Sequence, residues 1–166
     1  MKAGSIPMGD AIAYFLTWAT YGTWLPGDER GWVDYRQGWQ MPNPQRVLEA
    51  EALMSEEVCL LTPREREIVH GQVAETCQHR GWTLYAVNCR SNHIHVVVSA
   101  RCTEPEKVRD DLKAWCTRRL KERSDPTRLQ WWAERGSQRY VFDEDRLAEV
   151  IAYVLDAQDR MDREQT

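Results

Sequence analysis

The stretch WTLYAVNCRSNHIHVVVSA, residues 82–100, decides the fold of this chain. Residues 82–89 and 93–100 are rich in apolar, aromatic and β-branched side chains, which favour strands. Ser91 and Asn92 between them are typical of a turn. The stretch therefore predicts a β-hairpin.

Start and stop signals on either side of this hairpin predict five further elements. In chain order they are a strand over residues 11–20, a helix from Thr62-Pro63 to Gly81, a helix capped by Thr103 that has Pro105 at its second position and runs to about residue 121, a strand over 139–142, and a last helix capped by Asp143. Without the last helix, the order is β-α-β-β-α-β. This order predicts an α+β fold of the ferredoxin-like (split βαβ) type, with an antiparallel sheet, two helices on one face and an additional C-terminal helix. The other face of the sheet is expected to be open.

Residues 21–62 form an insertion between the first strand and the first helix. Glycine and proline recur through residues 22–44, which makes regular structure improbable there. The segment is nevertheless rich in aromatic residues, namely Tyr21, Trp24, Trp32, Tyr35 and Trp39. We expect an ordered loop, with aromatic rings that either pack on the sheet or form a stacking surface.

The length of 166 residues, with 42% hydrophobic and 29% charged residues, fits one globular domain over residues 1–166. Residues 159–166 are expected to be a frayed tail. No apolar run reaches the roughly 20 residues of a membrane span, and no signal peptide is evident, so a cytoplasmic location is expected. The five cysteines include no C-x-x-C pair, which argues against a zinc knuckle or a disulfide framework.

The charge distribution is uneven along the chain. The net charge is −4, but residues 112–140 hold eight Lys or Arg against three acidic residues. Such a basic segment either binds a polyanion or forms a solvated face. The candidate nucleic-acid contacts in and around it are Arg118, Arg119, Lys121, Arg123, Trp131, Arg135 and Arg139. Trp131 and Trp132 either stack on bases or anchor the core.

His93 and His95 are the first candidates for chemistry. Alternation along a strand places both imidazoles on one face, where they can bind one divalent metal ion. The alternative is a pair of solvent-facing histidines beside a turn. Tyr153 on the last helix lies off the apolar stripe, so it either caps the edge of the core or presents its hydroxyl to a site on the sheet. Tyr140 is the closest rival.

These residues resemble the single-tyrosine HUH transposase family, in its REP-associated and insertion-sequence branches. His93-Ile94-His95 resembles the His-hydrophobic-His signature, and the segments FLTWATYGTW (15–24) and LKAWCTRRL (112–120), with Tyr153, follow in the expected order. The resemblance implies a nuclease and strand transferase that acts on single-stranded DNA, possessing a Mg²⁺ or Mn²⁺ site and a 5′-phosphotyrosine intermediate at Tyr153. Hairpin-forming repeats are implied as a partner, with the protein acting as a monomer or homodimer.

One position departs from the pattern of that family. Members carry Gln or Asn four residues after the tyrosine as a third metal ligand, whereas this chain has Ala157 there and Gln158 one residue later. Either the helix winds wider locally, or the register differs, or Gln158 reaches the site from a frayed end; Asp156 is the substitute. Two other functions stay open, a catalytically silent nucleic-acid-binding module of the same fold and an unrelated metal-dependent hydrolase.

Overall fold

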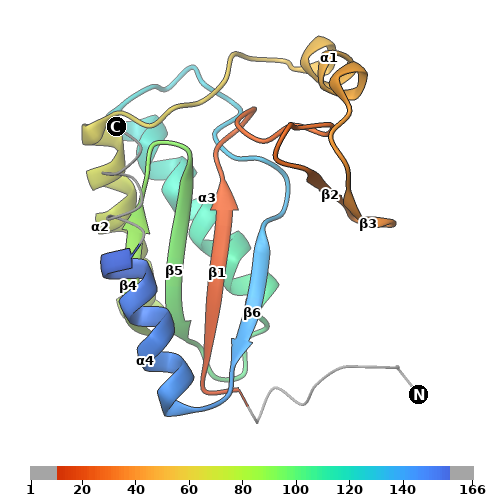
Figure 1. Ribbon diagram of the computed structural model, residues 1–166. Coiled ribbons are helices and arrows are strands. Elements are labelled where there is room, and N and C mark those ends of the chain that lie inside the picture. Colours follow the sequence, from red (N-terminus) through yellow and green to blue (C-terminus); the bar gives the residue numbers. More distant parts are fainter. Residues whose placement is uncertain (1–10, 158–166) are drawn as a thin grey trace.

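The computed structural model describes residues 11–157, and Gln158 and the tail lie outside this range. Its centre is an antiparallel four-stranded sheet with the strand order β4-β5-β1-β6 (Figure 1). The strands are β1 (Ala13–Ala19), β4 (Thr83–Cys89), β5 (His93–Ser99) and β6 (Ser137–Val141). The major helices are α2 (Pro63–Arg80), α3 (Pro105–Arg123) and α4 (Glu144–Ala152). The predicted ferredoxin-like arrangement is confirmed.

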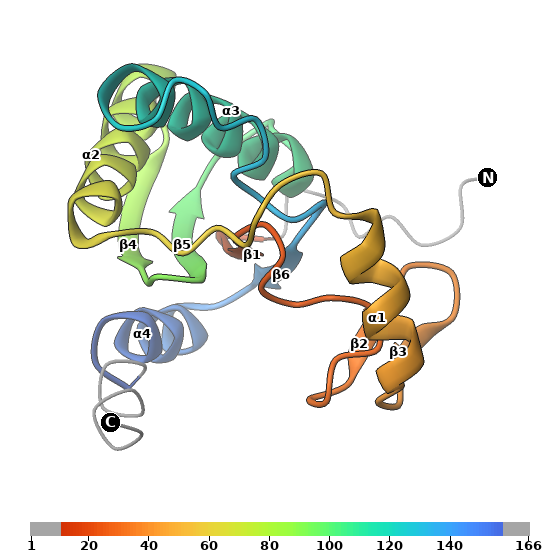
Figure 2. The same ribbon diagram turned by 90° about the horizontal axis from the view of Figure 1, so that it is seen from above.

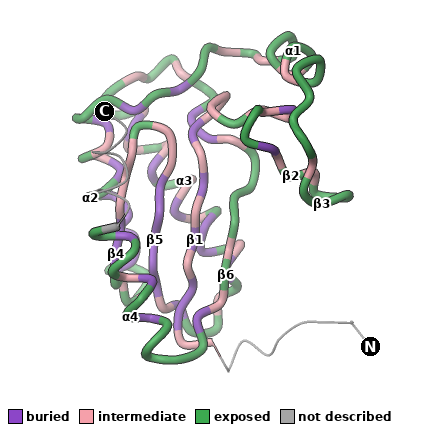
Figure 3. Tube along the Cα trace, in the orientation of Figure 1, coloured by how far each residue is buried: buried purple, intermediate pink, exposed green. Residues whose placement is uncertain are grey.

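Helices α2 and α3 cover one face of the sheet, and α4 lies against the other (Figure 2). Because side chains alternate along a strand, β5 sends Ile94, Val96 and Val98 to the α2/α3 face. These residues pack with Trp18 and Leu112 in the larger apolar cluster of the molecule. Figure 3 shows that burial is concentrated on β5 and β1, the two central strands.

The α4 face differs from the expectation of an open surface. Ala13 and Val97 from the sheet pack there against Leu147, Val150 and Val154 from the last helix. Leu147, Val150 and Val154 recur at helical spacing, so α4 has an apolar stripe that must be buried, and the sheet offers the free face. The face is therefore partly covered, and a site on it lies beside α4.

The ends of the helices follow their capping residues. Thr62 and Glu65 form a reciprocal capping box at the start of α2, and Gly81 ends that helix in the left-handed conformation. Asp143 caps α4 as predicted, by accepting a hydrogen bond from the Arg146 N–H. The prediction for α3 was wrong by one residue, because Glu104 occupies the N-cap and Pro105 the first helical position, where proline is favoured.

The insertion is more regular than its glycines and prolines suggested. It contains a hairpin of β2 (Trp32–Asp34) and β3 (Gly38–Gln40), followed by α1 (Pro44–Leu53). Gly38 takes a positive φ of 78° next to the turn, and the Asp34 carboxylate accepts two backbone N–H groups within it. Here the breaker residues shape turns between short elements. The hairpin and α1 project from the side of the sheet (Figure 2).

The five cysteines are all free thiols, and three of them are buried. Within residues 11–157, no helix is long and apolar enough to cross a membrane.

Candidate functional site

His93 and His95 lie side by side on the α4 face of the sheet. Strand β5 pairs with β1 so that His95 lies opposite Thr17 and His93 opposite Ala19. The two imidazole rings are 4.7 Å apart between centroids and are inclined by 72°. The alternation predicted from the sequence thus brings both rings to one place, at the start of β5 directly after the turn.

Each imidazole is oriented by a neighbouring polar group. His93 Nδ1 lies 2.6 Å from the side-chain oxygen of Asn92, so Nδ1 carries the proton and donates it. His95 Nδ1 lies 2.8 Å from the Thr17 hydroxyl, which can accept in the same way. In this arrangement the Nε2 atoms of both rings bear the lone pairs that a metal ion requires. The donor set therefore fits a divalent cation.

Burial keeps both rings neutral at physiological pH. His95 is only 8% exposed, and this desolvation, with help from His93 and Arg90, lowers its pKa to about 4. Burial also lowers the pKa of His93, with smaller contributions from Arg90 and Arg30. A neutral imidazole is the form that binds metals, so the pair is ready to ligate above the acidic range.

Tyr153 stands next to the histidine pair of its own chain. Its ring centroid lies 6.1 Å from that of His95 and 6.2 Å from that of Phe15. A pocket of about 490 Å³ includes Tyr153, His95 and Thr17 in its lining, together with Arg139 from β6 and Arg146 from α4. Tyr153 is 39% exposed, so its ring is accessible from this pocket.

The helix changes its winding at Tyr153. Residues Tyr153–Ala157 form a π-helical turn, in which hydrogen bonds run from i to i+5. A wider winding was one of the readings that the sequence left open. Such turns are frequent at functional sites because they re-aim side chains without ending the helix.

Asn88 ties this π turn to the sheet, and sequence reasoning missed it. Its side-chain amide donates a 2.8 Å hydrogen bond to the carbonyl of Val154, the residue after Tyr153. Asn88 also lies directly opposite His95 in the pairing of β4 with β5. The available signal was an amide side chain in an apolar strand, on the same face as His95.

No acidic side chain among the described residues gathers with the two histidines into a metal-binding group of three. Within residues 11–157, no three or more His, Cys, Asp or Glu side chains gather in a group that could hold a metal ion. Asp156, the predicted substitute, is exposed on the π turn and forms no such group with His93 and His95. Gln158, the other prediction, lies outside the described residues.

The predicted nucleic-acid contacts are divided between the two sides of the sheet. Arg118, Arg119, Lys121 and Arg123 all belong to α3, on the side away from the histidines. Arg119 bonds to Gln72 and Glu75 of α2, so it links two helices. The Arg118 guanidinium lies over Trp115, 5.2 Å from its ring centre.

The remaining predicted contacts lie after α3. Trp131 is 2% exposed and packs in the core with Trp132. Of the two roles considered for this pair, base stacking or anchoring of the core, the burial fits the second. Arg139 lines the pocket of Tyr153, whereas Arg135 lies over the ring of Tyr35 from the insertion.

Tyr140 lies on the wrong side of the sheet to reach the histidines. It packs against Tyr14 and Phe142 and borders the α2/α3 cluster. Its neighbours in β6, Arg139 and Val141, face α4 instead. The strand therefore separates Tyr140 from the site, and Tyr153 is the tyrosine that the structure brings to the histidine pair.

Comparison with known proteins agrees with this architecture. One similar structure is a REP-associated tyrosine transposase bound to a REP hairpin (TM-score 0.54, 8% identity), covering 97% of this chain and 74% of the other. Another, from Deinococcus radiodurans R1, is assigned as a candidate transposase (TM-score 0.52, 15% identity, covering 93% and 95%). No curated protein sequence matches. The sequence profile of the IS200-like transposases matches residues 55–154, a range that includes both histidines and Tyr153. The chain therefore belongs to the IS200-like transposase family and is an enzyme of the DNA transposase kind.

Proposed function

We propose that this protein is a metal-dependent endonuclease and strand transferase that acts on single-stranded DNA through a covalent 5′-phosphotyrosine at Tyr153. The observation that carries the proposal is the common pocket of Tyr153 and His95 within one chain. A nucleophile and a pair of metal-binding imidazoles at one place are what phosphodiester cleavage needs.

The covalent step conserves the energy of the phosphodiester bond. The Tyr153 hydroxyl loses its proton, and its oxygen bonds to the scissile phosphorus. The bond from phosphorus to the 3′ oxygen of the preceding nucleotide breaks, and that oxygen takes up a proton to leave a free 3′-OH. The reverse reaction with a different 3′-OH joins two strands and releases the tyrosine.

The metal-binding role falls to Nε2 of His93 and Nε2 of His95, while Asn92 and Thr17 hold the rings in place. A Mg²⁺ or Mn²⁺ ion bound there supplies positive charge that polarises the phosphate and stabilises its developing negative charge. Gln158 is the proposed third ligand.

The proposed DNA partner is a single strand, as a free segment or as the flank of a hairpin. One structurally similar transposase is bound to a REP hairpin, which supports a DNA partner of this kind. Arg139 and Arg146 border the pocket and offer cations to a phosphate backbone. Because nucleophile and histidines meet within one chain, the geometry favours action in cis by a monomer, with a homodimer as the alternative.

Tyr153→Phe tests the proposal. The variant and the wild type are incubated with single strands labelled at the 5′ or 3′ end and Mn²⁺, and the products are separated on denaturing gels. Wild type is expected to form an adduct with the fragment on the 3′ side of the cut, and Tyr153→Phe to form none while it still binds DNA. Tyr140→Phe is the matched control and should retain the adduct. Absence of an adduct in the wild type would favour a silent DNA-binding module instead.

A further inference from the structure

Arg135 and Tyr35 form one of the contacts between the insertion and the body of the protein. The guanidinium of Arg135 lies over the Tyr35 ring, 4.2 Å from its centre, and Arg36 lies 5.3 Å from the same centre. Tyr35 is 64% exposed, at the tip of the β2–β3 hairpin. The protein thus presents an accessible aromatic ring together with two cations.

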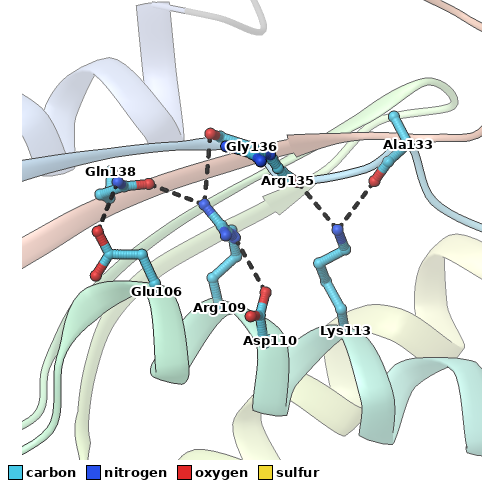
Figure 4. Close-up of polar contacts among 8 residues, drawn as sticks. All are labelled: Glu106, Arg109, Asp110, Lys113, Ala133, Arg135, Gly136 and Gln138. Atoms are coloured by element: carbon cyan, nitrogen blue, oxygen red, sulfur yellow. Dashed lines mark hydrogen bonds and ion pairs between the residues drawn. The ribbon is translucent and has the colours of Figure 1, made fainter. Parts of the chain in front are cut away.

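The loop that carries Arg135 is held firmly by α3 (Figure 4). Lys113 donates hydrogen bonds to the backbone carbonyls of Ala133 and Arg135, at 2.9 and 3.0 Å. Arg109, only 6% exposed, donates to the Gly136 carbonyl and to the side chain of Gln138. Two cations from one helix therefore fix the position of a short loop. Burying charged groups costs free energy, which the hydrogen bonds to this loop offset.

The backbone of this loop is also constrained. Arg135 has a positive φ of 64°, which costs free energy in a residue other than glycine. Gly136 follows with a φ of 158°, and a Cβ atom there would lie within 2.4 Å of the Thr17 carbonyl oxygen. Thr17 is the partner of His95, so the loop is seated directly against the strand that supports the candidate site.

From Arg135 the chain continues into β6 and reaches the pocket. Side chains two residues apart share a face of a strand, and Ser137 and Arg139 both line the pocket of Tyr153. At about 3.3 Å per residue, the path from Arg135 to Arg139 is about 13 Å long. The ring of Tyr35 and the guanidinium groups of Arg135 and Arg139 thus follow one edge of the sheet to the proposed nucleophile.

The charges along this edge favour an anionic strand. Within residues 11–157, neither Arg135 nor Arg139 forms an ion pair with a carboxylate, in contrast to Arg146, which pairs with Glu149. Asp34 precedes Tyr35 in the chain, and its carboxylate accepts hydrogen bonds from backbone N–H groups of its own turn. Glu134 is the remaining acidic neighbour in the loop, and it is exposed.

We propose that Tyr35 and Arg135 form a stacking platform for a base of the DNA strand whose phosphate enters the Tyr153 pocket, with Arg139 contacting the intervening backbone. This proposal rests on the proposed function and assigns a part in it to the insertion. A single strand is the fitting partner because it exposes both base faces and phosphates, which an aromatic ring and guanidinium groups bind. A duplex hides its base faces inside the stack.

The experiment measures binding of a fluorescein-labelled oligothymidylate, longer than the roughly 4–16 nucleotides that a small domain covers, across a salt series. All variants carry Tyr153→Phe, so that no cleavage interferes. Tyr35→Leu is expected to weaken binding by about 5- to 100-fold, as for loss of one base stack, and to leave the salt slope unchanged. Arg135→Asn keeps a residue that tolerates positive φ, and it is expected to weaken binding because the platform loses its guanidinium plane. Arg139→Asn removes the backbone contact, and it is expected to lower the slope by about 0.7. In the double variant of Tyr35 and Arg135 the losses should not add, because the two side chains touch.

Two matched controls lie far from this edge. Tyr85→Leu changes an exposed tyrosine on β4 at the opposite edge of the sheet, and Arg101→Asn removes a cation after the far end of β5. Both should bind the oligonucleotide like the parent. Parental binding by Tyr35→Leu and Arg135→Asn would overturn the platform, even where the wild type forms its adduct. A wild type without an adduct, combined with the expected losses, would refute the proposed function and leave the platform standing.

Discussion

The two faces of the β-sheet are built from the same strands and yet serve different ends. On the α2/α3 face, β5 contributes Ile94, Val96 and Val98 to an apolar cluster closed by two long helices. On the α4 face the same strand contributes His93 and His95 beside a single helix. The closed face supplies most of the buried apolar surface, so it can stabilise a second face that carries polar, partly exposed groups.

This comparison predicts that stability and chemistry can be changed separately. Substitutions on the α2/α3 face should lower the free energy of unfolding and leave the reactivity of each folded molecule unchanged. Those on the α4 face should act mainly on reactivity. The following experiments test this separation, in order of the expected change in free energy.

Leu112→Ala should have the largest effect. Leu112 is fully buried between α3 and the sheet, so truncation removes apolar burial and leaves a cavity. The free energy of unfolding should fall by about 2–5 kcal/mol, as measured by urea denaturation. Adduct formation per folded molecule should equal that of the wild type. A variant that is stable but fails to form the adduct would break the separation of the faces.

Acidification should destabilise the metal-free protein through the α4 face. The pKa of His95 is about 4 in the folded state and near 6.5 when unfolded, so between these values the unfolded chain binds more protons. The free energy of unfolding should therefore fall by up to about 3 kcal/mol as the pH drops from about 6.5 to about 4. His95→Gln should remove this component, whereas His79→Gln, at an exposed position of α2, should keep it. An identical pH profile for wild type and His95→Gln would contradict the prediction.

Mn²⁺ should stabilise the wild type through the histidine pair. A ligand that binds only the folded state at 100 times its Kd adds about 2.7 kcal/mol, which appears as a rise in Tm. His95→Ala should lose this rise, and EDTA should reverse it in the wild type. The measurement is thermal unfolding with and without the metal. The metal site would lie elsewhere if His95→Ala showed the full rise.

Asn88→Ala should cost less stability but impair the chemistry. It removes the hydrogen bond to the Val154 carbonyl, which is worth about 0.5–1.5 kcal/mol. Because this bond seats the π turn on the sheet, the rate of adduct formation should fall while DNA affinity stays the same. Cys89→Ala is the control, since the next residue of β4 faces the α2/α3 cluster. Equal adduct rates in both variants would deny Asn88 a positioning role.

The smallest effect on stability belongs to the basic end of α3. Replacing both Arg118 and Arg123 with Ala should change the free energy of unfolding by less than about 1 kcal/mol, because both side chains are exposed and the ion pair of Arg118 with Glu122 contributes little. If the α3 side also contacts DNA, as the charge distribution predicts, the salt slope of binding should decrease by about 0.7 for each contact. An unchanged slope would confine the DNA to the α4 face.

The sequence was a good guide wherever a local signal decided the structure. The period of two in β5 placed both histidines correctly, and the capping residues Thr62 and Asp143 marked two helix starts. Prediction from the sequence failed where contacts between distant segments determine the structure. The cover of α4 over the sheet, the bond from Asn88 to Val154 and the contact of Tyr35 with Arg135 all join residues far apart in the chain. The hairpin and α1 were missed because glycine and proline can mark turns between short elements as well as irregular loops.

The alternation in β5 also makes the proposed activity depend on correct folding. A slip of one residue in the pairing of β5 would send His93 and His95 into the apolar cluster and Ile94 to the pocket. Such a chain would lose its core and its reactive centre together. The proposed nuclease activity is thereby restricted to molecules whose β5 has paired in the correct register.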